Sequence, residues 1–360
     1  MLKRTWLPVV RAAPWLGLAL LQAGCAAADA REARVATDSV RYWDLPTGSH
    51  VAYRHVAGAP GRELPPLVYV HGGPGAYQVA RFDDSPEWWQ RLASLGFDVY
   101  AYDQVGSGLS GRLEDPTQYT GARHVADLEA IRTIIGAERV VLIGDSWGAS
   151  LSARYIATHP GRVGAAIFTS PGAIDHREWD PTLDTPQFSP DMLEWVRTSR
   201  GRNDFRRCLQ LDSLLRRDVH AAYARFRDAE MDPLFDAWVN SAITPRTVHD
   251  PARAPEARMT GMGWWVQTMT GYDMLSAAPV VRPLLALFER PVLILRGESD
   301  YLPAGMAEQY AATFPNARFV PVSGSGHLIW LERPDVYGGE IVRFLQQLVS
   351  DSARTVSAGT

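Results

Sequence analysis

The chain has 360 residues, 46% of them hydrophobic, with 36 basic and 40 acidic residues and a formal net charge of −4. This composition supports a sizeable core and excludes disorder of the whole chain. No basic block marks a phosphate-binding surface, so nucleic acid is not expected as a partner. The histidines and cysteines form no H-E-x-x-H or C-x-x-C grouping, so neither a metal nor another cofactor is expected.

The first 25 residues predict an export signal, because basic residues precede an apolar stretch at 15–21 and small residues follow up to Cys25. The apolar stretch is shorter than the roughly 20 residues that a membrane span needs. Gly24-Cys25 resembles a bacterial lipoprotein processing site, although Gln22 stands where an aliphatic residue is usual. We expect a lipidated Cys25 on the periplasmic side of a bacterial membrane, with that lipid as the sole membrane anchor. Cleavage after Ala28-Asp29-Ala30 is the alternative and would release a soluble periplasmic or secreted protein.

The ends of the mature chain are predicted to carry little structure. Residues 26–40 are alanine-rich and charged, which favours a tether, and residues 351–360 favour a flexible tail. Lipidation of Cys25 would leave Cys208 without a partner, so no disulfide is predicted and Cys208 is expected to be a small buried hydrophobe. The sequence leaves the oligomeric state open.

Between these ends, strand-like and helix-like segments alternate along the chain. Strands are predicted at 51–55, 67–71, 97–103, 139–143, 163–169, 291–296 and 318–322, and helices at 86–95, 122–135, 146–158, 304–314 and 334–348. Several strands are continuous apolar runs, which suits a sheet covered on both faces. The alternation predicts an α/β fold with a mostly parallel central sheet flanked by helices, built from residues 41–170 and 290–350.

The alternation stops at 171–289. This stretch is rich in helix formers and tryptophan and contains no convincing strand, so it is predicted to be a helical cap inserted after the strand at 163–169. Such an insertion would cover the carboxyl ends of the strands, where open α/β sheets bind ligands.

A serine stands where a predicted strand turns into a predicted helix. Gly144-Asp145-Ser146-Trp147-Gly148 has the G-x-S-x-G spacing of a nucleophile elbow, in which small residues two before and two after the serine let strand and helix approach closely. The pattern alone is weak. Its place between a strand and a helix makes Ser146 a candidate nucleophile.

A serine hydroxyl needs a base to take its proton and a third group to hold that base. The chain supplies both later in sequence: Asp300 follows the strand at 291–296, and His327 lies in a glycine-rich loop after the strand at 318–322. Glu298 competes for the acid role. We favour Asp300, because its distance from Gly297 gives the loop room to turn the carboxylate toward the histidine.

A glycine-rich segment, His71-Gly72-Gly73-Pro74-Gly75, comes directly after the apolar strand residues Leu67 to Val70. Negative charge on a substrate carbonyl oxygen needs preplaced N–H donors, and glycines let the backbone approach closely enough to supply them. We expect one donor to be the Trp147 N–H and the other to be Gly73 or Gly72.

Together these motifs resemble the prolyl aminopeptidase (proline iminopeptidase) family of α/β-hydrolases over about residues 40–350. The carriers of the resemblance are the segments at 71–75, 103–110, 144–148 and 296–300, with Gly326-His327. The resemblance implies an α/β-hydrolase fold with a helical cap, and a serine hydrolase that cleaves an N-terminal residue, often proline. It also implies acidic cap groups for the free amine of the substrate.

The chain departs from that family at two places. Val105 stands where an arginine is usual, and Trp264-Trp265 is followed by Val266-Gln267 where the family commonly has a Trp-Glu pair. The candidates for the missing amine-binding acid are Glu230, Asp232, Asp236 and Asp273. Trp264 and Trp265, with Trp238 and Tyr272, are expected to shape an apolar substrate pocket.

The sequence therefore predicts an exported serine hydrolase that works through an acyl-enzyme, with a small molecule or short peptide as substrate. An aminopeptidase of prolyl aminopeptidase type is the first expectation, and a carboxylesterase or lactonase is the alternative. A non-catalytic binding protein on a hydrolase scaffold is a minor alternative, disfavoured because all three triad positions are occupied.

Overall fold

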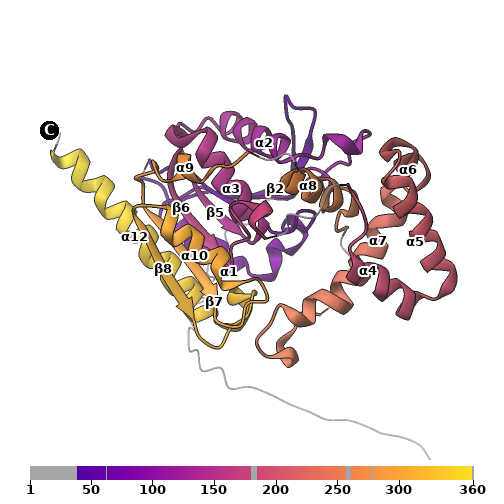
Figure 1. The fold of residues 1–360 in the computed structure, drawn as a ribbon. Coiled ribbons are helices and arrows are strands. Elements are labelled where there is room, and N and C mark those ends of the chain that lie inside the picture. The colour runs from indigo at the N-terminus through magenta and orange to yellow at the C-terminus, as the bar shows by residue number, and fades with distance from the viewer. Residues whose placement is uncertain (1–38, 62, 180–184, 257–260, 277–278, 359–360) are drawn as a thin grey trace, which may run out of the picture. The chain divides into compact units, whose positions relative to one another are not determined.

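The structure is a computed structural model that describes residues 39–61, 63–179, 185–256, 261–276 and 279–358. The predicted export signal, Cys25 and nearly all of the predicted tether lie outside the described residues. Residues Thr37–Thr360 form one compact unit, so core and cap belong together (Figure 1). No described helix is both long enough and apolar enough to cross a membrane.

The core is an eight-stranded sheet. Its strands are β1 (Arg41–Asp44), β2 (His50–Val56), β3 (Leu67–Val70), β4 (Val99–Tyr102), β5 (Val140–Asp145), β6 (Val163–Thr169), β7 (Val292–Gly297) and β8 (Ala317–Val322). Their spatial order is β1-β2-β4-β3-β5-β6-β7-β8. The β1–β2 and β2–β4 pairs are antiparallel and the rest are parallel, which confirms the mostly parallel sheet.

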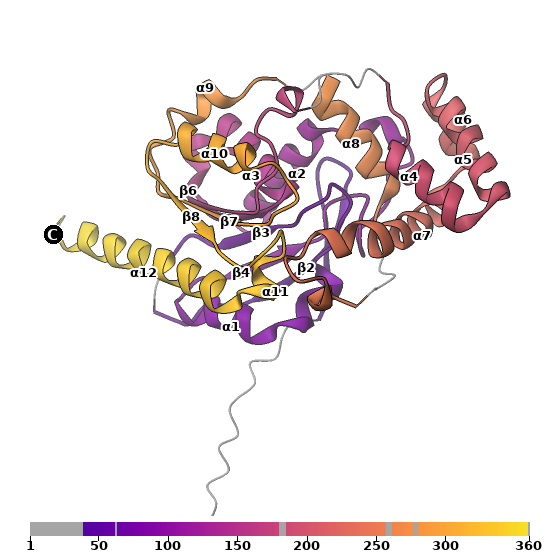
Figure 2. The same cartoon turned by 60° about the horizontal axis from the view of Figure 1, so that its bottom comes forward.

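Helices cover both faces of this sheet (Figure 2). On one side lie α2 (Gly121–Ile134), α3 (Trp147–Thr158), α9 (Arg282–Leu285) and α10 (Ala304–Thr313), and on the other α1 (Pro86–Ser94), α11 (Ile329–Glu332) and α12 (Pro334–Ala358). Strand β3 is apolar at every position because both of its faces are buried. Val68 and Val70 join the core under α2 and α3, whereas Leu67 and Tyr69 join the core under α1 and α12.

The structure differs from the prediction near both ends of the described chain. The strand β1 was not predicted, because it is a four-residue edge strand in which Trp43 alone is buried. Helix α12 continues to Ala358, through most of the segment 351–360 for which a flexible tail was expected. Cys208 is buried, as predicted.

The described part of 171–289 contains helices and no strand, as expected for a cap. Its main helices are α4 (Pro190–Trp195), α5 (Arg202–Leu215), α6 (Val219–Arg225), α7 (Asp228–Trp238) and α8 (Trp264–Ser276). The short α9, at the end of the same stretch, contacts α3 and α10 and so belongs to the helical layer of the core.

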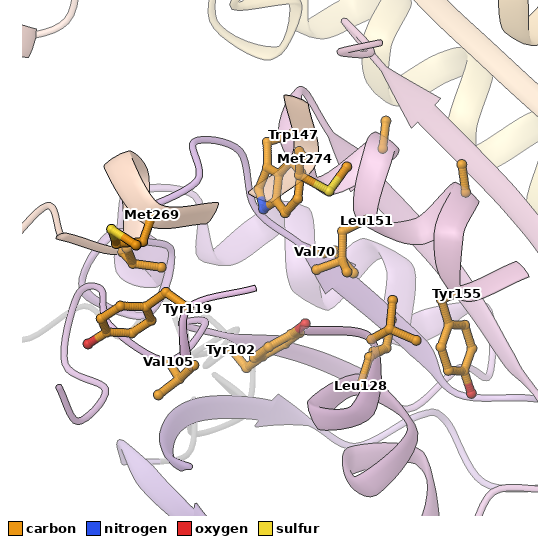
Figure 3. Close-up of a cluster of buried hydrophobic side chains, with 14 of the residues drawn as sticks. Val70, Tyr102, Val105, Tyr119, Leu128, Trp147, Leu151, Tyr155, Met269 and Met274 are labelled. Carbon is orange, nitrogen blue, oxygen red and sulfur yellow. The ribbon is translucent and has the colours of Figure 1, made fainter. Parts of the chain in front are cut away.

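Helix α8 attaches the cap to the core through apolar side chains. Met269 and Met274 lie beside Tyr119 and Trp147 in one buried cluster (Figure 3). Val105, which replaces the arginine usual in the family, is 1% exposed and packs in this cluster. An apolar residue therefore suits that position.

Candidate active site

Ser146 lies at the sharp turn between β5 and α3, with φ 54° and ψ −118°. This strained backbone is held by close packing around it. A Cβ on Gly148 would stand 1.9 Å from the Val70 carbonyl oxygen, and one on Gly144 would stand 2.6 Å from the Gly148 carbonyl oxygen. Glycine is therefore required at both positions, as the elbow spacing predicts.

The structure brings Asp300 and His327 together from loops that follow β7 and β8. His327 Nδ1 lies 2.8 Å from Asp300 Oδ1, and both side chains are almost fully buried. Glu298, the competing acid, is exposed. Ser146 and His327 line the same cavity. Asp300 thus holds Nδ1 of His327, and His327 borders the same cavity as Ser146.

The environment of His327 favours its charged form. Burial alone would lower the pKa of His327, but the hydrogen bond and charge of Asp300, with the charge of Asp145 beside them, raise the pKa above its ordinary value. The same two carboxylates would stabilise an imidazolium at His327.

A carboxylate missed at the sequence level fixes the loop that carries His327. Glu332, 2% exposed, accepts hydrogen bonds from the backbone N–H groups of Gly326, His249 and Asp250. Burial would raise the pKa of Glu332, but these three donors outweigh it and lower the pKa. The His327 loop is thereby tied to the cap segment between α7 and α8. Only its partners, more than 80 residues away in two cases, reveal this role.

Two backbone segments flank Ser146 at the places expected for oxyanion donors. Gly72 and Gly73 line the cavity, and Trp147 begins α3, where helix N–H groups lack a partner within the helix. Gln104 joins the two segments: its side chain donates to the His71 carbonyl and accepts from the Trp147 indole. Gln104 thus supports both segments, a role that the sequence did not reveal.

Above Ser146 lies a cavity of about 570 Å³ between the core and the cap. Its walls are largely aromatic and apolar, including Trp88, Trp238, Trp330, Tyr301 and Phe235. The described residues contain no group of three or more His, Cys, Asp or Glu side chains placed to hold a metal ion. The cavity suits a compact, mainly apolar acyl group.

The expectation that Trp264 and Trp265 bind substrate needs correction. Both rings are buried, at 2% and 0% exposure, and neither lines the cavity. They pack edge to face against each other, and the Trp265 indole donates to the Phe226 carbonyl. Large apolar rings on the inner side of α8 build the interior of the cap, while Gln267 from the same helix lines the cavity. Trp238 lines it as expected, and Tyr272 does not.

The four cap acids considered for amine binding are engaged elsewhere. Glu230 pairs with Arg207 on the surface, and Asp232 pairs with Arg112 at 2.8 Å. Asp236 accepts from the Gly261 N–H, and Asp273 accepts from the Gly121 N–H. None of the four lines the cavity. Their carboxylates stabilise the cap and its junction with the core.

A different carboxylate borders the nucleophile. Asp145, the residue before Ser146, lines the cavity and accepts a hydrogen bond from Thr169 Oγ1 at 2.7 Å. Burial raises the pKa of Asp145, against the opposing effects of the His327 charge and the Thr169 hydrogen bond. The sequence motif treats this position as variable, so its chemistry was not predicted.

Comparison with known proteins agrees with the fold and the site. The family model described as alpha/beta hydrolase fold matches residues 65–334. The chain therefore belongs to the α/β-hydrolase fold family, and the protein is a hydrolase.

The proteins that are similar to this chain include proline iminopeptidases and an esterase. The chain is 25% identical to a proline iminopeptidase of Heyndrickxia coagulans over 289 residues, which cover 79% of this chain and 91% of that protein. The fold is also similar to the crystal structure of a proline iminopeptidase of Mycobacterium smegmatis, with TM-score 0.56, 20% identity and coverage of 87% and 100%. An esterase from Rhodococcus sp. ECU1013 matches with TM-score 0.59, 18% identity and coverage of 86% and 100%.

Proposed function

We propose that the protein is a serine hydrolase that works through an acyl-enzyme. Ser146 Oγ attacks the substrate carbonyl carbon while His327 takes the hydroxyl proton, and Asp300 orients and stabilises the imidazolium. The N–H groups of Trp147 and Gly73 stabilise the oxyanion. His327 then gives its proton to the leaving group, and water repeats the sequence to release the acid. The observation that carries this proposal is the buried His327–Asp300 pair beside the strained Ser146 elbow.

The first candidate activity is that of an aminopeptidase of prolyl aminopeptidase type. The similarity to proline iminopeptidases over about four fifths of the chain supports it. The cavity supports it too, because its apolar walls suit a small side chain such as a proline ring on the acyl side.

Hydrolysis of esters or lactones is the second candidate, and one observation favours it. The cap acids that a family member would turn toward the substrate amine are occupied outside the cavity. An enzyme without amine recognition would accept neutral acyl groups.

A fluorophosphonate probe tests the nucleophile. We expect it to label the wild type and not Ser146→Ala. Equal labelling of both proteins, or no labelling of the folded wild type, would exclude the proposed mechanism.

Substrate panels test the activity. Proline and other aminoacyl arylamides are compared with short acyl esters and lactones on one preparation. The aminopeptidase assignment requires turnover of the arylamides, and activity on esters alone, indifferent to a free α-amine, would replace it with the esterase assignment.

We further propose that the chain is exported and anchored through a lipid on Cys25, on the strength of the apolar stretch at 15–21 and the Gly24-Cys25 site. Cys25→Ala should move the protein from the membrane fraction to the soluble periplasmic fraction. Unchanged membrane association of Cys25→Ala would contradict the lipid anchor.

A further inference from the structure

The proposed mechanism uses Ser146, His327, Asp300 and two backbone donors. It assigns no contact with substrate to one acidic group at the elbow, whose charge helps to raise the pKa of His327. The cavity lining includes three acidic residues, Asp84, Glu87 and Asp145. Asp84 and Glu87 are exposed residues on η1 (Val79–Asp84) and at the start of α1, whereas Asp145 sits in the elbow itself.

Closeness to Ser146 distinguishes Asp145 from the other two acids. In an aminoacyl substrate the α-nitrogen lies about 2.5 Å from the carbonyl carbon, because the two atoms are separated by two bonds. The group that binds this amine must therefore lie next to Ser146. A methyl group placed on Gly72 would stand 3.0 Å from Ser146 Cβ and 3.5 Å from Asp145 Oδ2. Nucleophile, oxyanion loop and Asp145 carboxylate thus border the same small space.

We propose that Asp145 is the specificity-determining acid of this enzyme, and that its carboxylate binds the protonated α-amine of an aminoacyl substrate bound at Ser146. This inference rests on the proposed serine hydrolase function and assigns to the elbow a role that the cap acids do not fill.

The side chain is held in a suitable position. Thr169 Oγ1 donates to Asp145 Oδ1, which leaves Oδ2 on the side of Gly72 and the cavity. A partly buried carboxylate is stabilised in its charged form by a cation, so an ammonium at Oδ2 would offset the cost of burial that raises the pKa of Asp145.

The charge of Arg81 reaches Asp145 and lowers its pKa, but the Arg81 guanidinium is engaged with other partners. Arg81 stacks over Trp330, with its guanidinium carbon 5.3 Å from the ring centre, and Arg81 Nε lies 3.8 Å from Asp84 Oδ2. Arg91 lies exposed on α1. The charge of Arg81 is thus partly balanced by Asp84, and His327 is neutral when it acts as base.

A matched pair of substrates isolates the amine. The aryl esters of proline and of cyclopentanecarboxylic acid have acyl groups of nearly the same shape, and the nitrogen is their main difference. The measured quantity is the ratio of kcat/KM for the prolyl ester to kcat/KM for the cyclopentanecarbonyl ester, at pH 7, where an α-amine with an ordinary pKa of about 7.7–8.0 is mostly protonated.

We expect the wild type to prefer the prolyl ester and Asp145→Asn to lower the ratio by about 30-fold, the loss typical of a charged hydrogen bond. Asn keeps an oxygen for Thr169, and Asp145→Ser provides an independent neutral replacement. Fluorophosphonate labelling of Ser146 in both variants verifies that the elbow is folded. Glu298→Gln, which removes an exposed charge outside the cavity, should keep the wild-type ratio.

Three results would overturn the inference without refuting the serine hydrolase. One is an unchanged ratio in Asp145→Asn and Asp145→Ser, and another is loss of the preference in Asp84→Asn or Glu87→Gln instead. The third is a wild type that cleaves the cyclopentanecarbonyl ester without preferring the prolyl ester, which would leave the serine hydrolase standing as an esterase. A wild type that cleaves neither ester and is not labelled at Ser146 would refute the proposed function, and the role of Asp145 with it.

Discussion

Asp300 acts on His327 in two ways that can be separated by experiment. Its hydrogen bond to Nδ1 sets the tautomer that leaves Nε2 free to accept a proton, and its charge helps to raise the pKa of His327. In the proposed mechanism His327 must be neutral to act as base, so its raised pKa moves the acid limb of the activity profile to higher pH. We therefore expect kcat/KM to fall, as pH decreases, at a pH above the ordinary histidine value of about 6.5.

Asp300→Asn should lower kcat by about 10⁴-fold through the wrong tautomer, and should move the acid limb of the remaining activity to lower pH. The measurement is a pH profile of kcat/KM on an activated ester. Glu298→Gln is the matched control, because Glu298 is exposed in the same loop. If Glu298→Gln lost activity while Asp300→Asn kept it, the choice between the two acids would be reversed.

At the scale of elements, the backbones at the elbow between β5 and α3 pack so closely that Gly144 and Gly148 have no space for a Cβ. Gly148→Ala places a methyl group 1.9 Å from the Val70 carbonyl oxygen, so strand and helix must separate. We expect a loss of about 3 kcal/mol or more in the free energy of unfolding, together with loss of fluorophosphonate labelling.

Gly271→Ala is the control for this change. Gly271 lies inside α8 with nothing within 4 Å of its added methyl group, so the substitution should stabilise by about 0.5–1 kcal/mol. Urea unfolding measures both variants. Equal midpoints for Gly148→Ala and the wild type would contradict the packing argument.

Helix α11 stabilises the fold through the side chain of its last residue, Glu332. Glu332 holds three backbone N–H groups, and its lowered pKa means that these bonds stabilise the fold above the ordinary value of 4.5 and are lost as the pH falls through the folded-state pKa. Glu332→Gln should cost about 2 kcal/mol at pH 7 and lower kcat through a displaced His327, and the stability difference should narrow at acid pH.

Unfolding curves at several pH values measure this effect. The exposed Glu308→Gln should stay within about 0.5 kcal/mol of the wild type throughout. A stability difference for Glu332→Gln that did not depend on pH would argue against the charged hydrogen bonds.

The elements also show how far the sequence alone could lead. The central strands were predictable because each has apolar residues on both faces, and the elbow because its glycines are a local steric need. Strand β1 was not predictable, because a strand with one buried residue in four shows no alternation of apolar and polar residues. Tryptophan occurs both in apolar pockets and in cores, so the sequence could not decide between the two for Trp264 and Trp265. Only tertiary packing assigns them to the core. The roles of Glu332 and Gln104 depend on partners from distant segments.

For the whole molecule, the cavity exists only while the cap is docked on the core. Besides the apolar contacts of α8, polar contacts join the cap to the core. Arg112, in the loop after β4, forms an ion pair with Asp232 of α7 at 2.8 Å and donates to the Gly261 carbonyl before α8. Asp232 is 7% exposed, so its charge depends on this partner.

Arg112→Gln should therefore destabilise the protein by about 3 kcal/mol, because it leaves a buried carboxylate unpaired. We expect faster cleavage of the cap in limited proteolysis and a higher KM, since the cavity wall loses its support, while fluorophosphonate labelling of Ser146 persists because the elbow belongs to the core. Arg207→Gln breaks the exposed pair with Glu230 within the cap and should cost less than about 1 kcal/mol. If Arg112→Gln matched Arg207→Gln in unfolding and in protease resistance, the apolar contacts of α8 alone would hold the cap.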